Sequence, residues 1–125
     1  LIVSDRVSHC ESLCKQIKEH TDDVALYLGK MSKEEKAKAV EKSIIIATYS
    51  MVSEGSDIPK LDTAFLTTPR TNIEQIIGRI QRDFSGKKEL LVIDMVLNTP
   101  YHKRLASKRI RAYKKLDFKQ YEFGE

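Results

Sequence analysis

The chain has 125 residues, the length of one domain, and hydrophobic residues make up 41% of it, which is enough to bury a single core. No apolar run approaches the length of a membrane-spanning helix and no signal-peptide layout is present, so we expect neither a membrane partner nor secretion. The chain opens on Leu1 without an initiator Met, and we therefore expect it to be part of a longer protein.

Strand patterns alternate with helical patterns along the chain. The apolar run Leu1–Ser4 predicts a strand, and Arg6–His20 then carries apolar residues at helical spacing. A second strand is predicted at Val24–Leu28, followed by a helix from about Lys33 with Ser32 as its cap. This order is strand, helix, strand, helix.

The middle of the chain continues the alternation. The segment Ser43–Ala47 contains three consecutive isoleucines, which is typical of a strand buried on both faces of a parallel sheet. A loop is expected from Thr48 to Lys60, and further strands at Thr63–Thr67 and Glu89–Val96, the latter again buried. The pattern predicts an α/β fold with a doubly wound, mostly parallel sheet and right-handed crossovers.

The segment Thr71–Arg82 predicts one helix with two different faces. One side carries only isoleucines and indicates a core stripe, while the opposite side carries Gln75, Gly78, Arg79 and Arg82. A glycine within a helix costs roughly 1 kcal/mol relative to alanine, so Gly78 on the polar face indicates close approach by another surface. The alternative interpretation of Thr71–Arg82 is a surface helix whose arginines are solvated. The isoleucines are Ile73, Ile76, Ile77 and Ile80.

The C-terminal segment predicts a basic helix that starts with Thr99 as N-cap and Pro100 at the first helical position. An apolar stripe packs it on the domain and includes Arg109, for which Asp94 is a candidate partner. Residues 118–123 form either a short strand or a disordered end. Seven basic residues and no acidic residue lie between Asp94 and Asp117, so the rest of the chain carries a net charge of −3, the total of +4 less these +7. These basic residues suit binding to a nucleic-acid backbone or another polyanionic partner, or they form a plain solvated face. The seven are Lys103, Arg104, Lys108, Arg109, Arg111, Lys114 and Lys115.

Ligands of doubly wound sheets bind beyond the carboxyl ends of the strands. Residues 4–6, 29–30, 48–57 and 67–70 follow predicted strands and should share that edge. Thr48 ends a buried strand, where its hydroxyl and nearby backbone N–H groups can hold a phosphate without reading a base, or can simply cap the turn.

Four segments resemble superfamily 2 helicases and translocases. The spacing Q-x-x-G-R-x-x-R over residues 75–82 resembles the last signature motif of their second RecA-like lobe. Residues 1–13 are similar to motif IV of phage and large-virus members, 28–35 to a segment that touches a nucleic-acid phosphate, and 47–59 to motif V. The chain therefore resembles the C-terminal RecA-like lobe of a DEAD/DEAH-type helicase of the phage and large-DNA-virus branch.

The resemblance implies a role for each matching residue. Arg82 is the implied arginine finger, a group worth roughly 10³ to 10⁵ in the rate of phosphoryl transfer, and Arg79 assists at the phosphate or orients the interface. Gln75 links this helix to the ATP-binding motifs of the other lobe. Gly55 and Asp57 line the nucleotide, although residues 55–57 taken in isolation favour an ordinary turn.

The nucleic-acid contacts implied by the resemblance are Thr48 and, more weakly, Arg6 and Lys30, each a basic residue after a strand. The expected partner is DNA or RNA, with DNA favoured, bound through its phosphate backbone and hence with little sequence preference.

The chain contains neither a G-x-x-x-x-G-K-[S/T] loop nor a D-E-x-D/H segment. The resemblance therefore implies ATP with Mg²⁺ as cofactor, the Mg²⁺ being held by an N-terminal RecA-like lobe of the same protein, and we expect the isolated chain not to hydrolyse ATP. Residues 1–98 would form the core of the lobe and 99–125 a basic helix and tail packed on it. Asp83 and Phe84 depart from common versions of the last motif.

Two other interpretations stay open. One is a non-catalytic nucleic-acid-binding or adaptor module with a RecA-like fold, and the other is an unrelated small-molecule binder with a doubly wound sheet. His9, Cys10 and Cys14 lack a fourth metal ligand nearby, and the cysteines belong to an apolar stripe, so core packing rather than a metal site is expected. Two cysteines are too few for a disulfide framework, which favours an intracellular setting, whether cytoplasm, nucleus, viral replication site or virion.

Overall fold

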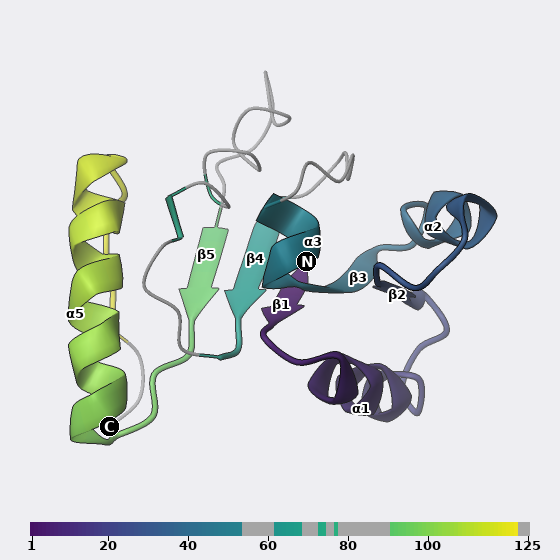
Figure 1. Ribbon diagram of the computed structural model, residues 1–125. Helices are drawn as coiled ribbons and strands as arrows, with labels where there is room; N and C mark the ends of the chain where they lie inside the picture. The colour runs from purple at the N-terminus through teal and green to yellow at the C-terminus, as the bar shows by residue number, and fades with distance from the viewer. Residues whose placement is uncertain (54–61, 69–72, 75–76, 78–90, 123–125) are drawn as a thin grey trace.

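The computed structural model describes residues 1–53, 62–68, 73, 74, 77 and 91–122. Within them, five strands form one sheet in the order β2-β3-β1-β4-β5 (Figure 1). The strands are β1 (Ile2–Ser4), β2 (Val24–Tyr27), β3 (Ile44–Thr48), β4 (Thr63–Leu66) and β5 (Leu91–Asp94). The helices are α1 (Val7–Ile17), α2 (Lys33–Ala39), α3 (Tyr49–Ser53) and α5 (Pro100–Lys115).

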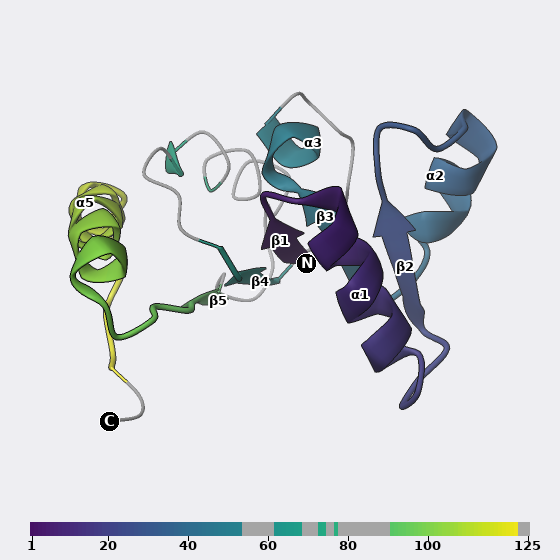
Figure 2. The ribbon, with the colours of Figure 1, turned by 60° about the horizontal axis from the view of Figure 1, so that its bottom comes forward.

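All pairs among these strands are parallel. β1 lies between β3 and β4, β2 pairs with β3, and β4 pairs with β5. Parallel neighbours need crossover connections, and α1 and α2 supply them between β1, β2 and β3. Figures 1 and 2 show α2 at the β2 end of the sheet and α5 at the β5 end. The predicted α/β fold is confirmed.

Two cores form because alternate residues of a strand face opposite sides of the sheet. On one side, Ile46 of β3 packs with Cys10 and Cys14 of α1. On the other side, Ile45 and Ala47 of the same strand belong to a larger cluster to which α2, α3 and α5 contribute. Both cysteines are buried, so their predicted role in core packing is confirmed. The helices on two faces make the sheet doubly wound.

Two predicted helix starts are confirmed by their caps. The backbone N–H of Glu35 donates to Ser32 Oγ at 3.2 Å at the start of α2. The backbone N–H of His102 donates to Thr99 Oγ1 at 3.1 Å, and Pro100 takes the first helical position of α5. Each hydroxyl satisfies one of the N–H groups that a helix start leaves without a partner.

The predicted loop from Thr48 to Lys60 was wrong in its first part. Thr48 is the last residue of β3, and the following residues form the short helix α3. Tyr49 and Val52 are spaced one helical turn apart and both are buried in the larger core, which explains the helix. One turn is too short to show a helical period in the sequence.

The prediction of a buried strand at Glu89–Val96 was also wrong in part. Among the described strands, β5 lies at the edge of the sheet and pairs with β4 alone, and Leu91 is 56% exposed. Val92 points to the opposite side and packs against the larger core. A continuous apolar run in sequence does not distinguish this half-covered edge from a central strand.

The end of the chain adds no strand within residues 118–122. Helix α5 ends at Lys115, with Leu116 as its C-cap. The next residue, Asp117, has a φ of 63° in the left-handed region, and the Phe118 N–H donates to the Tyr113 carbonyl at 2.9 Å. The Phe118 ring then meets Tyr113 edge to face, with ring centroids 6.0 Å apart. The tail thus packs back on α5 and the larger core.

Candidate functional site

The carboxyl ends of β1 and β3 bring two hydroxyl residues side by side. Ser4 ends β1, Thr48 ends β3, and the two are register partners in the parallel pair. Ser4 is fully buried and Thr48 is 6% exposed. The prediction that residues 4–6 and Thr48 share one edge of the sheet is confirmed.

Ser4 fixes the turn that leads from β1 into α1. Its Oγ lies 2.7 Å from His9 Nδ1 and accepts a 3.3 Å hydrogen bond from the Arg6 backbone N–H. Arg6 is the N-cap residue of α1 in extended conformation, and its side chain makes no capping bond and is exposed. The backbone of Arg6 is held while its guanidinium faces solvent, which suits a contact with a phosphate.

Residues 67 and 68, which follow β4, join the same edge. Thr67 Oγ1 donates to the Val3 carbonyl at 2.8 Å, and Thr68 Oγ1 accepts from the Asp5 N–H at 2.9 Å. These bonds tie the exit of β4 to the exit of β1. The edge is therefore preorganised by bonds between its own loops.

Tyr49 links α3 to this edge and was missed by sequence reasoning. Its side chain is fully buried, and its hydroxyl donates to the Thr68 carbonyl at 2.9 Å. Burial raises the pKa of Tyr49 to about 12, against smaller opposing effects, so the phenol stays a neutral donor at physiological pH. The only sequence signal was an aromatic residue directly after Thr48, which is ordinary core composition.

Thr48 makes a local contact as well. Its Oγ1 lies 3.1 Å from Ser50 Oγ in the first turn of α3. This bond agrees with the turn-capping alternative, and it also holds two hydroxyls together at the carboxyl end of a buried strand. Both interpretations of Thr48 therefore remain compatible with its surroundings.

Lys30 follows β2, and the structure ties it to α1. Its Nζ lies 3.3 Å from Glu11 Oε2, with 63% and 48% of the two side chains exposed. An ion pair this exposed contributes about 0 to 1 kcal/mol and exchanges readily for another anion. The structure does not bring Lys30 into the hydrogen-bond network of Ser4 and Thr68.

The predicted nucleotide-site residues Gly55, Asp57, Gln75, Arg79 and Arg82 lie outside the described residues. Two of the four predicted core isoleucines are described, and both are fully buried: Ile73 and Ile77. The Ile77 N–H donates to the Ile73 carbonyl at 2.9 Å, the bond of an α-helical turn. The apolar face predicted for this segment is confirmed at these two positions.

A buried charge cluster, formed by Asp94, Arg109 and Tyr113, joins α5 to β5. Arg109 Nε and Nη2 donate to the two carboxylate oxygens of Asp94 at 2.7 and 2.9 Å, and the Tyr113 hydroxyl donates to Oδ2 at 2.7 Å. Arg109 is 1% exposed. The predicted pairing of Arg109 with Asp94 is confirmed.

The electrostatics of the Asp94 cluster keep both α5 groups protonated. Burial acts to lower the pKa of Arg109, but the hydrogen bonds and charge of Asp94 outweigh it and raise that pKa. Burial, together with the bond to Asp94, raises the pKa of Tyr113. The Arg109 guanidinium thus lies in the interior, bonded to a carboxyl group whose side chain is 17% exposed.

Two features are absent from the part of the chain that the structure describes. No group of three His, Cys, Asp or Glu side chains in this part of the chain is placed to hold a metal ion. No helix among the same residues is long and apolar enough to cross a membrane.

Comparison with known proteins gives viral relatives, although no family model matches the chain. A protein of Acanthamoeba polyphaga mimivirus, named as a candidate ATP-dependent RNA helicase, is 40% identical over 74 residues, or 59% of this chain and 14% of that protein. A candidate helicase of Escherichia phage T5 is 26% identical over 123 residues, or 91% of this chain and 27% of that protein. The chain thus spans under a third of the length of these relatives.

Solved structures of helicases have a similar fold. The C-terminal domain of the DEAD-box protein Dbp5 matches with a TM-score of 0.68 and 15% identity over 94% of this chain and 70% of that one. Bacteriophage T4 UvsW matches with a TM-score of 0.69 and 24% identity over 91% of this chain and 28% of that one. This chain matches a C-terminal RecA-like helicase lobe. The expected resemblance to the C-terminal RecA-like lobe of superfamily 2 helicases, and to phage and large-virus members among them, is confirmed by these relatives and by this fold.

Proposed function

We propose that this chain is the second motor lobe of an ATP-dependent superfamily 2 helicase or translocase. The observation that carries the proposal is the edge where Ser4 and Thr48 are register partners and Thr68 ties the neighbouring loops together. Such an edge lies where ligands of doubly wound sheets bind. Residues 1–98 would form the core of the lobe and 99–125 its basic helix and tail, in a protein that works inside the cell.

Nucleic acid would cross this edge along its phosphates. Thr48 offers a hydroxyl at the end of β3, Arg6 offers an exposed guanidinium one loop away, and Lys30 can exchange its exposed Glu11 partner for a phosphate. Phosphate contacts carry no base information, so little sequence preference is expected.

RNA is the first nucleic acid to test. The mimivirus relative is named for RNA, and Dbp5 of S. cerevisiae, a structural match with a TM-score of 0.64, has been solved bound to RNA. The preference for DNA expected from the sequence has no support among these matches.

ATP would bind between this lobe and an N-terminal RecA-like lobe that also holds Mg²⁺, and its hydrolysis would supply the free energy for movement along the strand. On this chain, Gly55 and Asp57 would line the nucleotide and Gln75 would face the partner lobe. Arg79 and Arg82 would stabilise the charge that develops on the phosphoryl group. Burial of Ile73 and Ile77 supports this proposal, because a helix that turns these two isoleucines inward would carry positions 75, 78, 79 and 82 on its other side.

The proposal is tested by ATP hydrolysis of the intact protein with and without single-stranded RNA or DNA. Hydrolysis should rise with nucleic acid, and Thr48→Val should raise the nucleic-acid concentration for half-maximal stimulation by about tenfold or more, because it removes a hydrogen bond to a charged group. The KM for ATP should stay unchanged.

Thr63→Val is the matched control, since Thr63 begins β4 at the opposite edge and its hydroxyl contacts only the exposed Asp62 in the described part of the chain. Absence of stimulation by both RNA and DNA would overturn the motor-lobe proposal and leave the non-catalytic adaptor module as the better account.

A further inference from the structure

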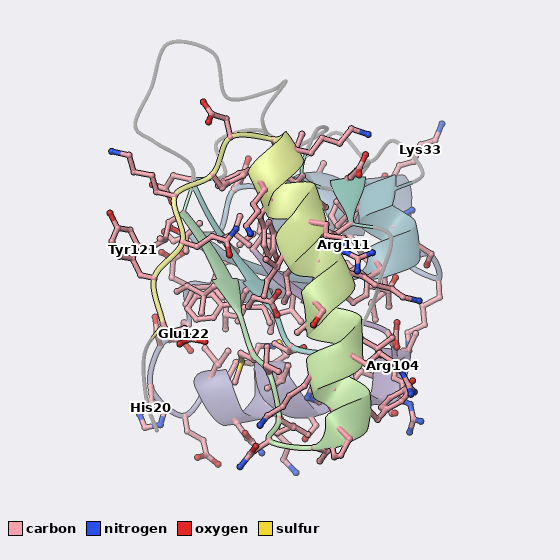
Figure 3. The ribbon with its side chains drawn as sticks, turned by 90° about the vertical axis from the view of Figure 1, so that its left-hand side faces the viewer. His20, Lys33, Arg104, Arg111, Tyr121 and Glu122 are labelled. Atoms are coloured by element: carbon pink, nitrogen blue, oxygen red, sulfur yellow. The ribbon has the colours of Figure 1, made fainter. Side chains whose placement is uncertain are left out.

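Helix α5 carries a strongly basic outer face, defined here as its six exposed basic side chains. No acidic residue occurs in α5. Figure 3 looks onto this side of the molecule and shows Arg104 and Arg111 along the helix. The six residues are Lys103, Arg104, Lys108, Arg111, Lys114 and Lys115.

The Asp94 cluster fixes which way this face points. Arg109 lies on the buried side and its planar guanidinium bonds both oxygens of Asp94, so the rotation of α5 about its axis is set. At 100° per residue, the six basic positions fall within an arc of about 140° centred opposite Arg109. From Lys103 to Lys115 they cover about 18 Å of helix. The result is a fixed, one-sided row of positive charge.

This row is unfavourable for the helix itself. Arg104 with Lys108 and Arg111 with Lys115 are like charges four residues apart, each pair destabilising by a few tenths of a kcal/mol. Lys103 also stands in the first turn, where the helix dipole disfavours cations. Among the described residues, Glu74 is the carboxylate that pairs with this basic outer face. Its Oε2 lies 3.5 Å from Lys115 Nζ, and both side chains are exposed. A polyanion would relieve this repulsion.

The basic face starts on the side of the sheet where the strands end, which is also the side of the candidate site. Strand β5 ends at Asp94, and Figure 1 shows α5 starting beyond that end of the sheet and running back past β5. Tyr101 in its first turn is 52% exposed, and the Arg104 guanidinium lies 5.7 Å from its ring centroid. Basic side chains interleaved with an exposed aromatic ring are the composition of single-strand binding surfaces, where bases stack on rings.

We propose that the outer face of α5 is a second binding surface for single-stranded nucleic acid, holding the backbone of a strand that leaves the carboxyl-end edge. This inference rests on the proposed function, because it extends the path of the same strand. It assigns the contacts to lysine and arginine charges rather than to base recognition, so its signature is the salt dependence of binding.

The test is the binding of a fluorescently labelled oligouridine to the intact protein over a series of KCl concentrations. The triple variant Lys108→Gln, Arg111→Gln and Lys114→Gln should reduce the slope of log affinity against log salt by about 2, since each lost phosphate contact removes about 0.7 for single strands. From about 50 to about 200 mM salt, the wild type should therefore lose about 16-fold more affinity than the variant.

The matched control is Lys15→Gln, Lys18→Gln and Lys38→Gln, three exposed lysines of α1, its C-cap and α2 that carry the same total charge change. It should keep the wild-type slope, as should Lys108→Arg with Lys114→Arg, which retains the charges of α5.

Each outcome separates the two claims. If wild type binds and both triple variants show one slope, the inference about α5 is wrong while the proposed function stands. If wild type binds no nucleic acid at any salt concentration, the proposed function itself fails. If the α5 variant loses affinity for polyglutamate but not for oligouridine, the face binds an acidic protein and the nucleic-acid inference is overturned.

Discussion

Replacing Asp94 with Asn should destabilise the chain far more than breaking any exposed ion pair. The Arg109 side chain is 2% exposed and that of Asp94 17%, with guanidinium to carboxylate bonds of 2.7 and 2.9 Å. Removing one partner of a buried pair costs about 3 to 5 kcal/mol, because the other charge stays in the interior without compensation. We expect about 3 kcal/mol, since partial exposure of Asp94 lets water reach the site.

The assay is urea unfolding followed by circular dichroism, with Glu11→Gln as the matched control. This control also turns a carboxylate into an amide beside a cation, but its pair with Lys30 is exposed and should cost about 0 to 1 kcal/mol. The double variant Asp94→Leu with Arg109→Met should recover most of the loss, because it leaves no buried charge. A cost for Asp94→Asn no larger than that of Glu11→Gln would refute the reasoning.

Three further predictions concern single side chains. Burial raises the pKa of Tyr49 to about 12 in the folded state, whereas the unfolded phenol has a pKa near 10, so the contribution of this group to stability is full below about pH 10 and falls by about 3 kcal/mol towards pH 12. Tyr49→Phe should make the fall in unfolding free energy with pH shallower in urea titrations at successive pH values. An unchanged dependence on pH would contradict the assignment. The Cys10 thiol is fully buried and burial raises its pKa, so a thiol reagent should label it only after urea is added, and labelling within the first minute in native buffer would contradict its packing. Asp117→Gly should raise stability by about 1 kcal/mol, because Asp117 follows the C-cap of α5 with a φ of 63° that glycine adopts without strain. A lower urea midpoint would show that local bonds of the aspartate matter more.

The sequence predicted best those features that depend on local pattern. Consecutive isoleucines in β3 and the hydroxyls of Ser32 and Thr99 carry their own structural preference, so the strand and the two helix starts appear where expected. Arg109 within an apolar stripe needed a carboxylate, and Asp94, which ends the preceding strand, was the suitable one nearby. Parallel pairing then placed Ser4 beside Thr48.

Features that depend on distant contacts could not be predicted. Tyr49 bonds a carbonyl 19 residues away, and Lys30, in the turn after β2, bonds Glu11 of α1, so neither partner can be recognised from the local sequence. The exposure of β5 follows from its place at the edge of the sheet, which only the strand order reveals. The roles of Gly55, Asp57, Gln75, Arg79 and Arg82 stay predictions from motif resemblance.

The most direct test of the motor-lobe account is nucleic-acid-stimulated ATP hydrolysis by the intact protein carrying Arg82→Ala, with ATP binding measured in parallel. The account predicts a fall in hydrolysis of about 10³-fold or more while ATP still binds, because an arginine finger acts on the transition state. Lys42→Ala, at the opposite edge of the sheet before β3, should hydrolyse ATP like wild type. Hydrolysis by Arg82→Ala at the wild-type rate would contradict the account.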